Sequence, residues 1–476
     1  MLKVLNVRYP ALPLHPPESN MMRALPFLLL AACAREPSTD TPAAAAPDTA
    51  ATPDEPFTPT LPTAQCGMPE YTWRSAEELG TLVAFEEQEG LSFSKAALQT
   101  LITTFGVADQ VGDLQNGVQT YFVRYQTQDR GELVEATGMI VYPDLTGEVP
   151  VLLWLHPTMG FSDDCAPTAI GIEGAALPLL LASMGFIVVA PDYLGMSGYA
   201  GPSEQMHPYI VAEPTAVASL DALRALDRLQ EAVSPPVTPA RDRLVMWGAS
   251  QGGFAALWAD RFLPHYLPSY TAVGSIAAIP ATDMTGLARH GVTVSGETSA
   301  AVAAAQVTMH DWYRSDADLD QVFVNGLGEV LADVINTECE DFSAMDDINT
   351  VEDIFTPEYI AGILAEDLEP WMCFLEESTL RESTVPHAND TPTLMVLAEE
   401  DSLAIADYAR ADIEALCAQG YRIEHLECAG LGHVDGAVTT LLRQLDWARA
   451  RVDGDAWDAS RVCVINEPED CEEGEQ

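Results

Sequence analysis

The sequence predicts an α/β fold, in which a mostly parallel central sheet is flanked by helices and a helical segment is inserted between two strands. Three observations lead to this prediction. Short apolar runs alternate with helical patterns, a glycine-rich turn joins one such run to a helix, and the alternation stops for about a hundred residues before it resumes. Because parallel strands need crossover connections, helices are expected on both faces of the sheet.

The expected strands are short and rich in Val, Ile and Leu, as buried parallel strands require. An antiparallel hairpin comes first, and the strands are expected over 118–125, 133–142, 149–155, 186–190, 244–247, 274–279, 393–398 and 422–427. Apolar residues at helical spacing predict the main helices over 177–184, 214–232, 251–262, 408–416 and 437–451. Pro178 would then lie in the first turn of its helix, where proline is tolerated.

The interruption from about 285 to 387 is mostly helical and acidic, and it carries large apolar side chains such as Trp312 and Trp371. An insertion between sheet strands is typical of a cap domain. Because ligands bind at the carboxyl ends of parallel strands, we expect this segment to cover the substrate. The alternative is a helical decoration without a role at the site. Most of its aromatic and methionine side chains are expected to form the core of the cap itself.

The N-terminus is expected to be a targeting segment. Arg23 precedes the apolar run 24–32, which is too short to span a bilayer but fits the core of a signal peptide. The run ends at Cys33 in a pattern similar to a bacterial lipobox, so Cys33 is expected to be lipidated after cleavage. The protein would be anchored at the cell envelope, or secreted if Cys33 is an incidental cysteine. Met21 and Met22 are alternative start positions.

Composition narrows the range of expected binding partners and cofactors. The formal net charge is −50, from 72 acidic and 22 basic residues, so neither nucleic acid nor an anionic membrane is an expected partner, apart from an anchor at Cys33. Eight cysteines remain after Cys33, and export favours disulfides, although 105 pairings are open. The sequence has no C-x-x-C pair and no glycine-rich phosphate loop, so neither a metal nor a cofactor is expected.

The strongest chemical signal is the segment Gly-Ala-Ser-Gln-Gly-Gly over 248–253. It follows the apolar run 244–247 and precedes a helix, which is the context of a nucleophile elbow in the α/β-hydrolase fold. The strand and the helix nearly touch at such a turn, so small residues must surround the nucleophile. We therefore expect Ser250 to be the nucleophile, against the alternative of a simple packing turn.

A serine hydroxyl needs a base, and in this fold the chain order is serine, acid, histidine. His433 lies in a Gly-Leu-Gly-His segment just past the last expected strand, on a loop at its carboxyl end, and is the expected base. The acid should follow the strand 393–398, where Asp401 is the best placed and Glu400 is the reserve.

An oxyanion hole needs two backbone N–H groups. One is expected from Gln251, directly after the nucleophile. The other should come from the loop after the strand 149–155, where Thr158 or Met159 is the candidate donor. His156, in the same loop, is interpreted as a buried structural histidine.

These residues together resemble the secretory lipase family of lipase-A-like α/β-hydrolases, over roughly residues 66–450. The segments that carry the resemblance are 123–127, 135–138, 164–167, 190–195, 207–209, 247–253 and 432–433. Ala398 departs from the family, in which glycine is common at that position. The resemblance implies hydrolysis of acyl esters, often lipids, under a helical cap inserted before the strand that bears the acid.

The sequence therefore predicts an exported hydrolase that cleaves small-molecule or lipid esters through an acyl-enzyme. A peptidase or amidase with the same site, and a non-catalytic binding module on the same fold, are the alternatives. Acyl-chain length and oligomeric state cannot be read from the sequence. The expected divisions are a signal segment, a disordered Thr/Pro/Ala linker, a core with the nucleophile, a cap, a core with acid and histidine, and a solvated acidic tail, over 1–33, 34–65, 66–284, 285–387, 388–465 and 466–476.

Overall fold

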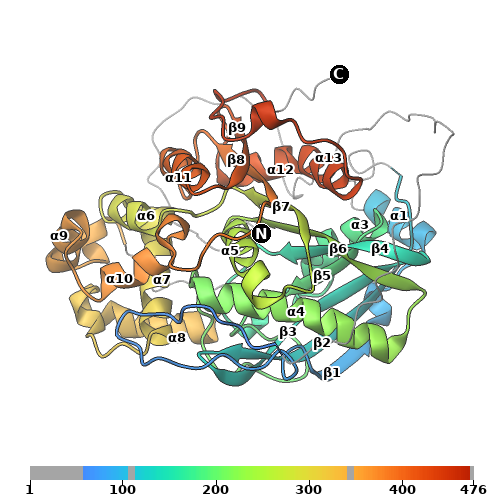
Figure 1. Cartoon of the computed structure of the whole chain (residues 1–476). Coiled ribbons are helices and arrows are strands. Elements are labelled where there is room, and N and C mark those ends of the chain that lie inside the picture. Colours follow the sequence, from blue (N-terminus) through green and yellow to red (C-terminus); the bar gives the residue numbers. More distant parts are fainter. Residues whose placement is uncertain (1–56, 105–112, 340–347, 472–476) are drawn as a thin grey trace.

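A computed structural model describes residues 57–104, 113–339 and 348–471 of the chain (Figure 1). The expected signal segment, Cys33 and most of the expected linker lie outside the described residues.

Within the described residues, nine strands form one sheet in the order β1-β2-β3-β5-β4-β6-β7-β8-β9. The strands from β5 to β9 in this order are parallel, and β1, β2 and β3 add an antiparallel edge. Their bounds are β1 Leu82–Glu87, β2 Val118–Asp129, β3 Glu132–Pro143, β4 Gly147–Leu155, β5 Ile187–Pro191, β6 Val237–Ala249, β7 Ala272–Ala278, β8 Pro392–Ala398 and β9 Arg422–Cys428. The predicted α/β architecture is confirmed, while β1 was not predicted.

Helices cover both faces of the sheet, as the alternating pattern predicted (Figure 1). One face is covered by α4 (Ala212–Val233), α5 (Gln251–Tyr266) and α11 (Ala406–Ala418), whose buried side chains join one hydrophobic core. The other face packs against a second core. The helices of that second face are α1 (Lys95–Thr104), α3 (Ile172–Ser183) and α13 (Leu441–Val452).

Two predicted helices differ from the observed ones. Helix α3 begins at Ile172, so Pro178 lies inside it and not in its first turn. Gly174 permits the earlier start, because a side chain there would collide with the backbone of Pro167. The single helix expected over 437–451 is two helices, α12 (His433–Thr439) and α13. The break lies at Thr440, whose hydroxyl donates a hydrogen bond back to the Gly436 carbonyl at 2.8 Å.

The segment between β7 and β8 is largely helical, as expected, and lies beside the end of the sheet (Figure 1). Helix α7 (Glu297–Trp312) is hydrogen-bonded to the core at several points. The Thr308 hydroxyl, for example, donates to the Tyr209 carbonyl at 3.2 Å, and the Thr298 hydroxyl donates to the Ser402 carbonyl. Its helices are α6 (Met284–Gly291), α7 (Glu297–Trp312), α8 (Leu327–Thr337), α9 (Pro357–Ala365) and α10 (Trp371–Glu377).

The segments expected to be a tether and a solvated tail are packed where the structure describes them. Leu61 is only 6% exposed, and its carbonyl accepts a hydrogen bond from the Trp73 indole at 2.8 Å, so the expected linker does not extend to residue 65. The tail expectation is wrong for 466–471, because Cys471 is buried and bonded to Cys428.

The eight cysteines after Cys33 form four disulfides, which accords with the expected oxidising compartment. Each joins segments far apart in the sequence, and the pairs are Cys66–Cys373, Cys165–Cys339, Cys417–Cys463 and Cys428–Cys471. In the described part of the chain, no helix is long and apolar enough to cross a bilayer.

Candidate active site

Ser250 occupies a strained turn between β6 and α5. Its backbone has φ 56° and ψ −118°, a left-handed φ that non-glycine residues adopt only when their surroundings enforce it. Its N–H donates to the Ala278 carbonyl of the neighbouring strand at 2.9 Å. A Cβ on Gly252 would lie 1.9 Å from the Leu155 carbonyl oxygen, and one on Gly248 would lie 2.2 Å from the Gly252 oxygen. The glycines therefore permit the close approach of β4, β6 and α5 that the expected elbow requires.

His433 is the first residue of α12, and it contacts both other members of the predicted set. Its Nε2 lies 2.8 Å from the Ser250 hydroxyl oxygen, and its Nδ1 lies 2.7 Å from Oδ2 of Asp401. A carboxylate can only accept, so Nδ1 carries the ring proton and Nε2 is free to accept the serine proton. The three side chains form one continuous chain of hydrogen bonds.

Asp401 is fixed by the turn that follows β8. Its second oxygen, Oδ1, accepts the N–H groups of Leu403 and Ala404, both at 2.8 Å, and the residue is only 5% exposed. Glu400 points elsewhere: it is exposed, and its own N–H donates to the Leu431 carbonyl at 2.9 Å. The structure therefore places Asp401 against the histidine, and not the reserve candidate.

The expected oxyanion donors lie on two segments that meet at the elbow. Gln251 is the first residue of α5, so its N–H has no partner within the helix, and the helix N-terminus favours negative charge there. The loop after β4 passes directly over this turn, since the absent side chain of Gly252 would meet the carbonyls of Leu155 and His156. Thr158 lies in that loop with its hydroxyl 3.2 Å from the Tyr209 hydroxyl. Next to it, Met159 presents its carbonyl to Cys339.

The sequence reasoning missed His207, which holds the side chain of Gln251. Its Nδ1 donates to the Leu194 carbonyl at 2.8 Å, and its Nε2 accepts from the Gln251 amide at 2.8 Å. Burial lowers the pKa of His207 to about 4, so the ring stays neutral near pH 7 and keeps Nε2 as an acceptor. The His-Pro-Tyr segment pointed to the family, but its spacing gave no signal of this contact.

His156 matches the interpretation of a buried structural histidine. Its ring nitrogens lie 2.7 Å from the Pro157 carbonyl and 3.3 Å from the Asp192 carbonyl, and the ring packs on Tyr193. Burial lowers the pKa of His156 to about 4. Among residues 57–104, 113–339 and 348–471, no three His, Cys, Asp or Glu side chains are grouped to hold a metal ion.

Comparison with known proteins points to one family. The secretory lipase family matches residues 160–459. A curated relative from Mycobacterium tuberculosis (strain CDC 1551 / Oshkosh), named as a probable inactive lipase, is 32% identical over 124 residues, which are 26% of this chain and 25% of the relative. The chain therefore aligns with about a quarter of that relative's length.

Solved structures of other proteins share the fold. The rice cell wall degrading esterase LipA from Xanthomonas oryzae, in a ligand-bound form, has a TM-score of 0.63 at 22% identity, over 79% of this chain and 97% of its own. Candida antarctica lipase A in its closed state has a TM-score of 0.61 at 14% identity, over 85% of this chain and 87% of its own. Both likenesses support the α/β-hydrolase fold.

Proposed function

The chain belongs to the secretory lipase family, and we propose that it hydrolyses carboxylic esters with Ser250 as nucleophile, His433 as base and Asp401 as orienting acid. The observation that carries this proposal is the continuous chain of hydrogen bonds from the serine hydroxyl to the aspartate. Because one relative is named as probably inactive, family membership alone does not establish activity, and this geometry is the stronger argument.

The proposed reaction has two steps. Ser250 Oγ attacks the ester carbonyl while His433 Nε2 takes the hydroxyl proton, and the same proton passes to the departing alcohol as the acyl-enzyme forms. Water then attacks the acyl-enzyme while His433 takes a proton from it. The bond to Ser250 Oγ breaks, the proton passes from His433 to that oxygen, and the acid product leaves. Asp401 accepts from Nδ1–H throughout, which holds the ring in the required tautomer and stabilises the imidazolium.

The oxyanion of each tetrahedral intermediate would be bound by the N–H of Gln251 and an N–H from Thr158 or Met159. Two features support this assignment: Gln251 begins α5, where the N–H has no partner within the helix, and the loop that contains Thr158 and Met159 passes over the elbow. The segment 285–387 is proposed as the substrate cap, because α7 contacts both the loop of Asp401 and the segment that holds Tyr209.

The four disulfides and the family indicate an exported protein. Lipid anchoring at Cys33 is a finer proposal that rests on the sequence pattern. Mass spectrometry of the N-terminal peptide from a bacterial host would detect the acyl groups, and an unmodified Cys33 would contradict it.

The test of the proposed function is Ser250→Ala. We expect the variant to lose p-nitrophenyl ester cleavage by at least about a thousandfold while its melting temperature stays close to that of the wild type, because only the attacking oxygen is removed. Fluorophosphonate labelling of the wild type, absent in the variant, reports the activated serine directly. An unlabelled, inactive wild type across short and long acyl esters would overturn the proposal.

A further inference from the structure

The chain after α13 returns to the sheet and covers β9, the last strand in the sheet order. We call residues 462–471 the C-terminal clasp. An edge strand exposes backbone donors and acceptors that need partners. At the amino-terminal end of β9, Cys463 N–H donates to the Ile423 carbonyl at 2.6 Å. Further along, Asn466 uses its side-chain amide to donate to the His425 carbonyl at 2.7 Å, and its N–H donates to the Nδ1 of the same histidine at 3.1 Å.

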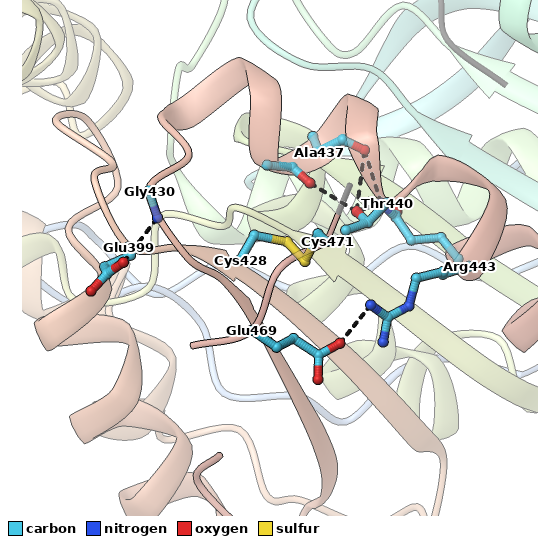
Figure 2. The surroundings of a disulfide bond; sticks show 10 residues. Glu399, Cys428, Gly430, Ala437, Thr440, Arg443, Glu469 and Cys471 are labelled. Carbon is cyan, nitrogen blue, oxygen red and sulfur yellow. Dashed lines mark hydrogen bonds and ion pairs between the residues drawn. A yellow bond between two sulfur atoms is a disulfide. The ribbon is translucent and has the colours of Figure 1, made fainter. Parts of the chain in front are cut away.

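The clasp also holds the opposite, carboxyl end of β9. Glu469 N–H donates to the Glu427 carbonyl, and Ala429 N–H donates to the Glu469 carbonyl, both at 2.8 Å. Between these two bonds, Cys428 forms its disulfide with Cys471, and both cysteines are buried (Figure 2). The backbone of β9 is therefore hydrogen-bonded to the clasp on both sides of Cys428, the last residue of the strand.

This same strand end joins the two loops of the active site. The Cys428 carbonyl accepts the N–H of Glu399 at 3.0 Å, and the Leu431 carbonyl accepts the N–H of Glu400 at 2.9 Å. The Glu399 carboxylate in turn accepts the N–H of Gly430 at 2.9 Å (Figure 2). The loop after β8, which bears the acid, and the loop after β9, which leads to His433 at the start of α12, are thus hydrogen-bonded to each other beside the disulfide.

We propose that Glu469 and Cys471, at the end of the clasp that lies beside the active-site loops, position His433 for proton transfer. This inference rests on the proposed function. His433 lies five residues after Cys428, and its ring must remain within hydrogen-bonding distance of Ser250, now 2.8 Å away. A displacement of about 1 Å from the reactive geometry reduces the rate on the order of a hundredfold. Movement at the end of β9 would shift both active-site loops together.

The second disulfide of the clasp supplies a matched control. Cys417–Cys463 ties the same segment to helix α11, beside the amino-terminal end of β9 and away from His433. The two disulfides span 46 and 43 residues, and the effect of a cross-link on the unfolded chain varies only with the logarithm of that span. Removing either should therefore destabilise the protein to a similar degree, whereas only one removal should disturb the histidine.

The experiment compares Cys428→Ala/Cys471→Ala with Cys417→Ala/Cys463→Ala in the full chain, measuring kcat, KM and melting temperature with one p-nitrophenyl ester. Both variants should melt at lower temperature, but only the first should lose kcat, by about tenfold to a hundredfold with KM nearly unchanged. Fluorophosphonate labelling should slow in parallel. Equal kcat in the two variants would overturn the proposal.

A second variant covers the case in which the first does not fold. Glu469→Pro keeps both disulfides but removes the N–H that donates to Glu427, together with the partly exposed ion pair between Glu469 and Arg443, which is expected to contribute little. Its kcat should fall several-fold while the disulfides remain intact by mass spectrometry. A kcat equal to that of the wild type would overturn the role of the clasp. Failure of the proposed function is distinguishable, because the wild type itself would then be inactive and unlabelled.

Discussion

Ser250 and His433 meet at one hydrogen bond, but the chain holds them by different means. The serine is positioned within one strand–turn–helix unit, and its immediate glycines permit the required backbone approach. The histidine depends on Asp401, 32 residues earlier, and on a strand end whose disulfide spans 43 residues. The nucleophile is therefore a local feature of the sequence, whereas the base and its acid are assembled from distant segments.

This difference has a physical basis. A tight turn restricts few residues and needs no loop closure, while bringing distant segments together carries an entropic cost that contacts or cross-links must offset. The four disulfides each join remote segments, and one of them, Cys428–Cys471, fastens the chain end to the strand that leads to His433. The long-range half of the site is thus the half that receives covalent support.

The largest effect is expected from Asp401→Asn, which tests the part of the site that is assembled from distant segments, His433 and Asp401. The substitution keeps the size of the side chain but presents a different donor and acceptor set to His433 Nδ1, so the wrong tautomer is favoured. We expect kcat to fall by about 10⁴ with little change in melting temperature, measured by ester hydrolysis.

Glu400→Gln is the matched control for that variant. Its carboxylate does not contact the histidine, so kcat should remain within about twofold of the wild type. If Glu400→Gln were the more damaging change, the assignment of the acid by long-range placement would be wrong.

A smaller effect, on stability, is expected from Gly252→Ala, which tests the locally encoded turn around Ser250. The added methyl would lie 1.9 Å from the Leu155 oxygen, a backbone atom that can move only if β4 moves. We expect a loss of about 3 kcal/mol in the free energy of unfolding, measured by denaturant titration, together with loss of activity.

Gly90→Ala provides the comparison, because nothing lies within 4 Å of the added methyl and the backbone of Gly90 is not left-handed. It should be nearly neutral. A tolerated Gly252→Ala would show that the elbow is not locally constrained.

The smallest effect concerns His207. Its contact with Gln251, 44 residues away, connects the turn around Ser250 to a distant segment. Burial lowers the pKa of His207 to about 4 from its ordinary 6.5, so the folded state keeps the ring neutral where the unfolded chain is protonated. This contribution to stability is complete above pH 6.5 and is lost as the pH falls towards 4. Between pH 7 and pH 5, the free energy of unfolding of His207→Gln should therefore fall by about 2 kcal/mol less than that of the wild type.

Urea titrations of both proteins at the two pH values measure this difference. Because the other titrating groups are shared, their contributions cancel in the comparison. Parallel pH profiles for the two proteins would show that His207 does not remain neutral in the folded state.

The sequence predicted most strands and the residues that form the hydrogen-bonded set. Strands such as 393–398 were found because a buried strand is apolar on both faces, and Ser250 because its turn carries its own glycines. The predicted start of α3 was wrong, since Gly171 and Gly174 are typical of a loop. Only the structure shows that the backbone of Pro167 packs against Gly174.

The acidic end of the chain shows the same limit. Its composition is that of a solvated tail, and no local pattern reveals that Glu469 pairs with β9 or that Cys471 bonds to Cys428. His207 was missed for a similar reason, because its partner Gln251 lies 44 residues away in the sequence.

By itself, the sequence determined the alternating architecture, the position of the inserted segment and the nucleophile turn, since each depends on neighbouring residues and the periodicity of strands and helices. Only the tertiary structure decided which acid faces His433, how eight cysteines pair, and where the chain end docks. Those outcomes depend on contacts between residues tens of positions apart, and local propensities are compatible with many such arrangements.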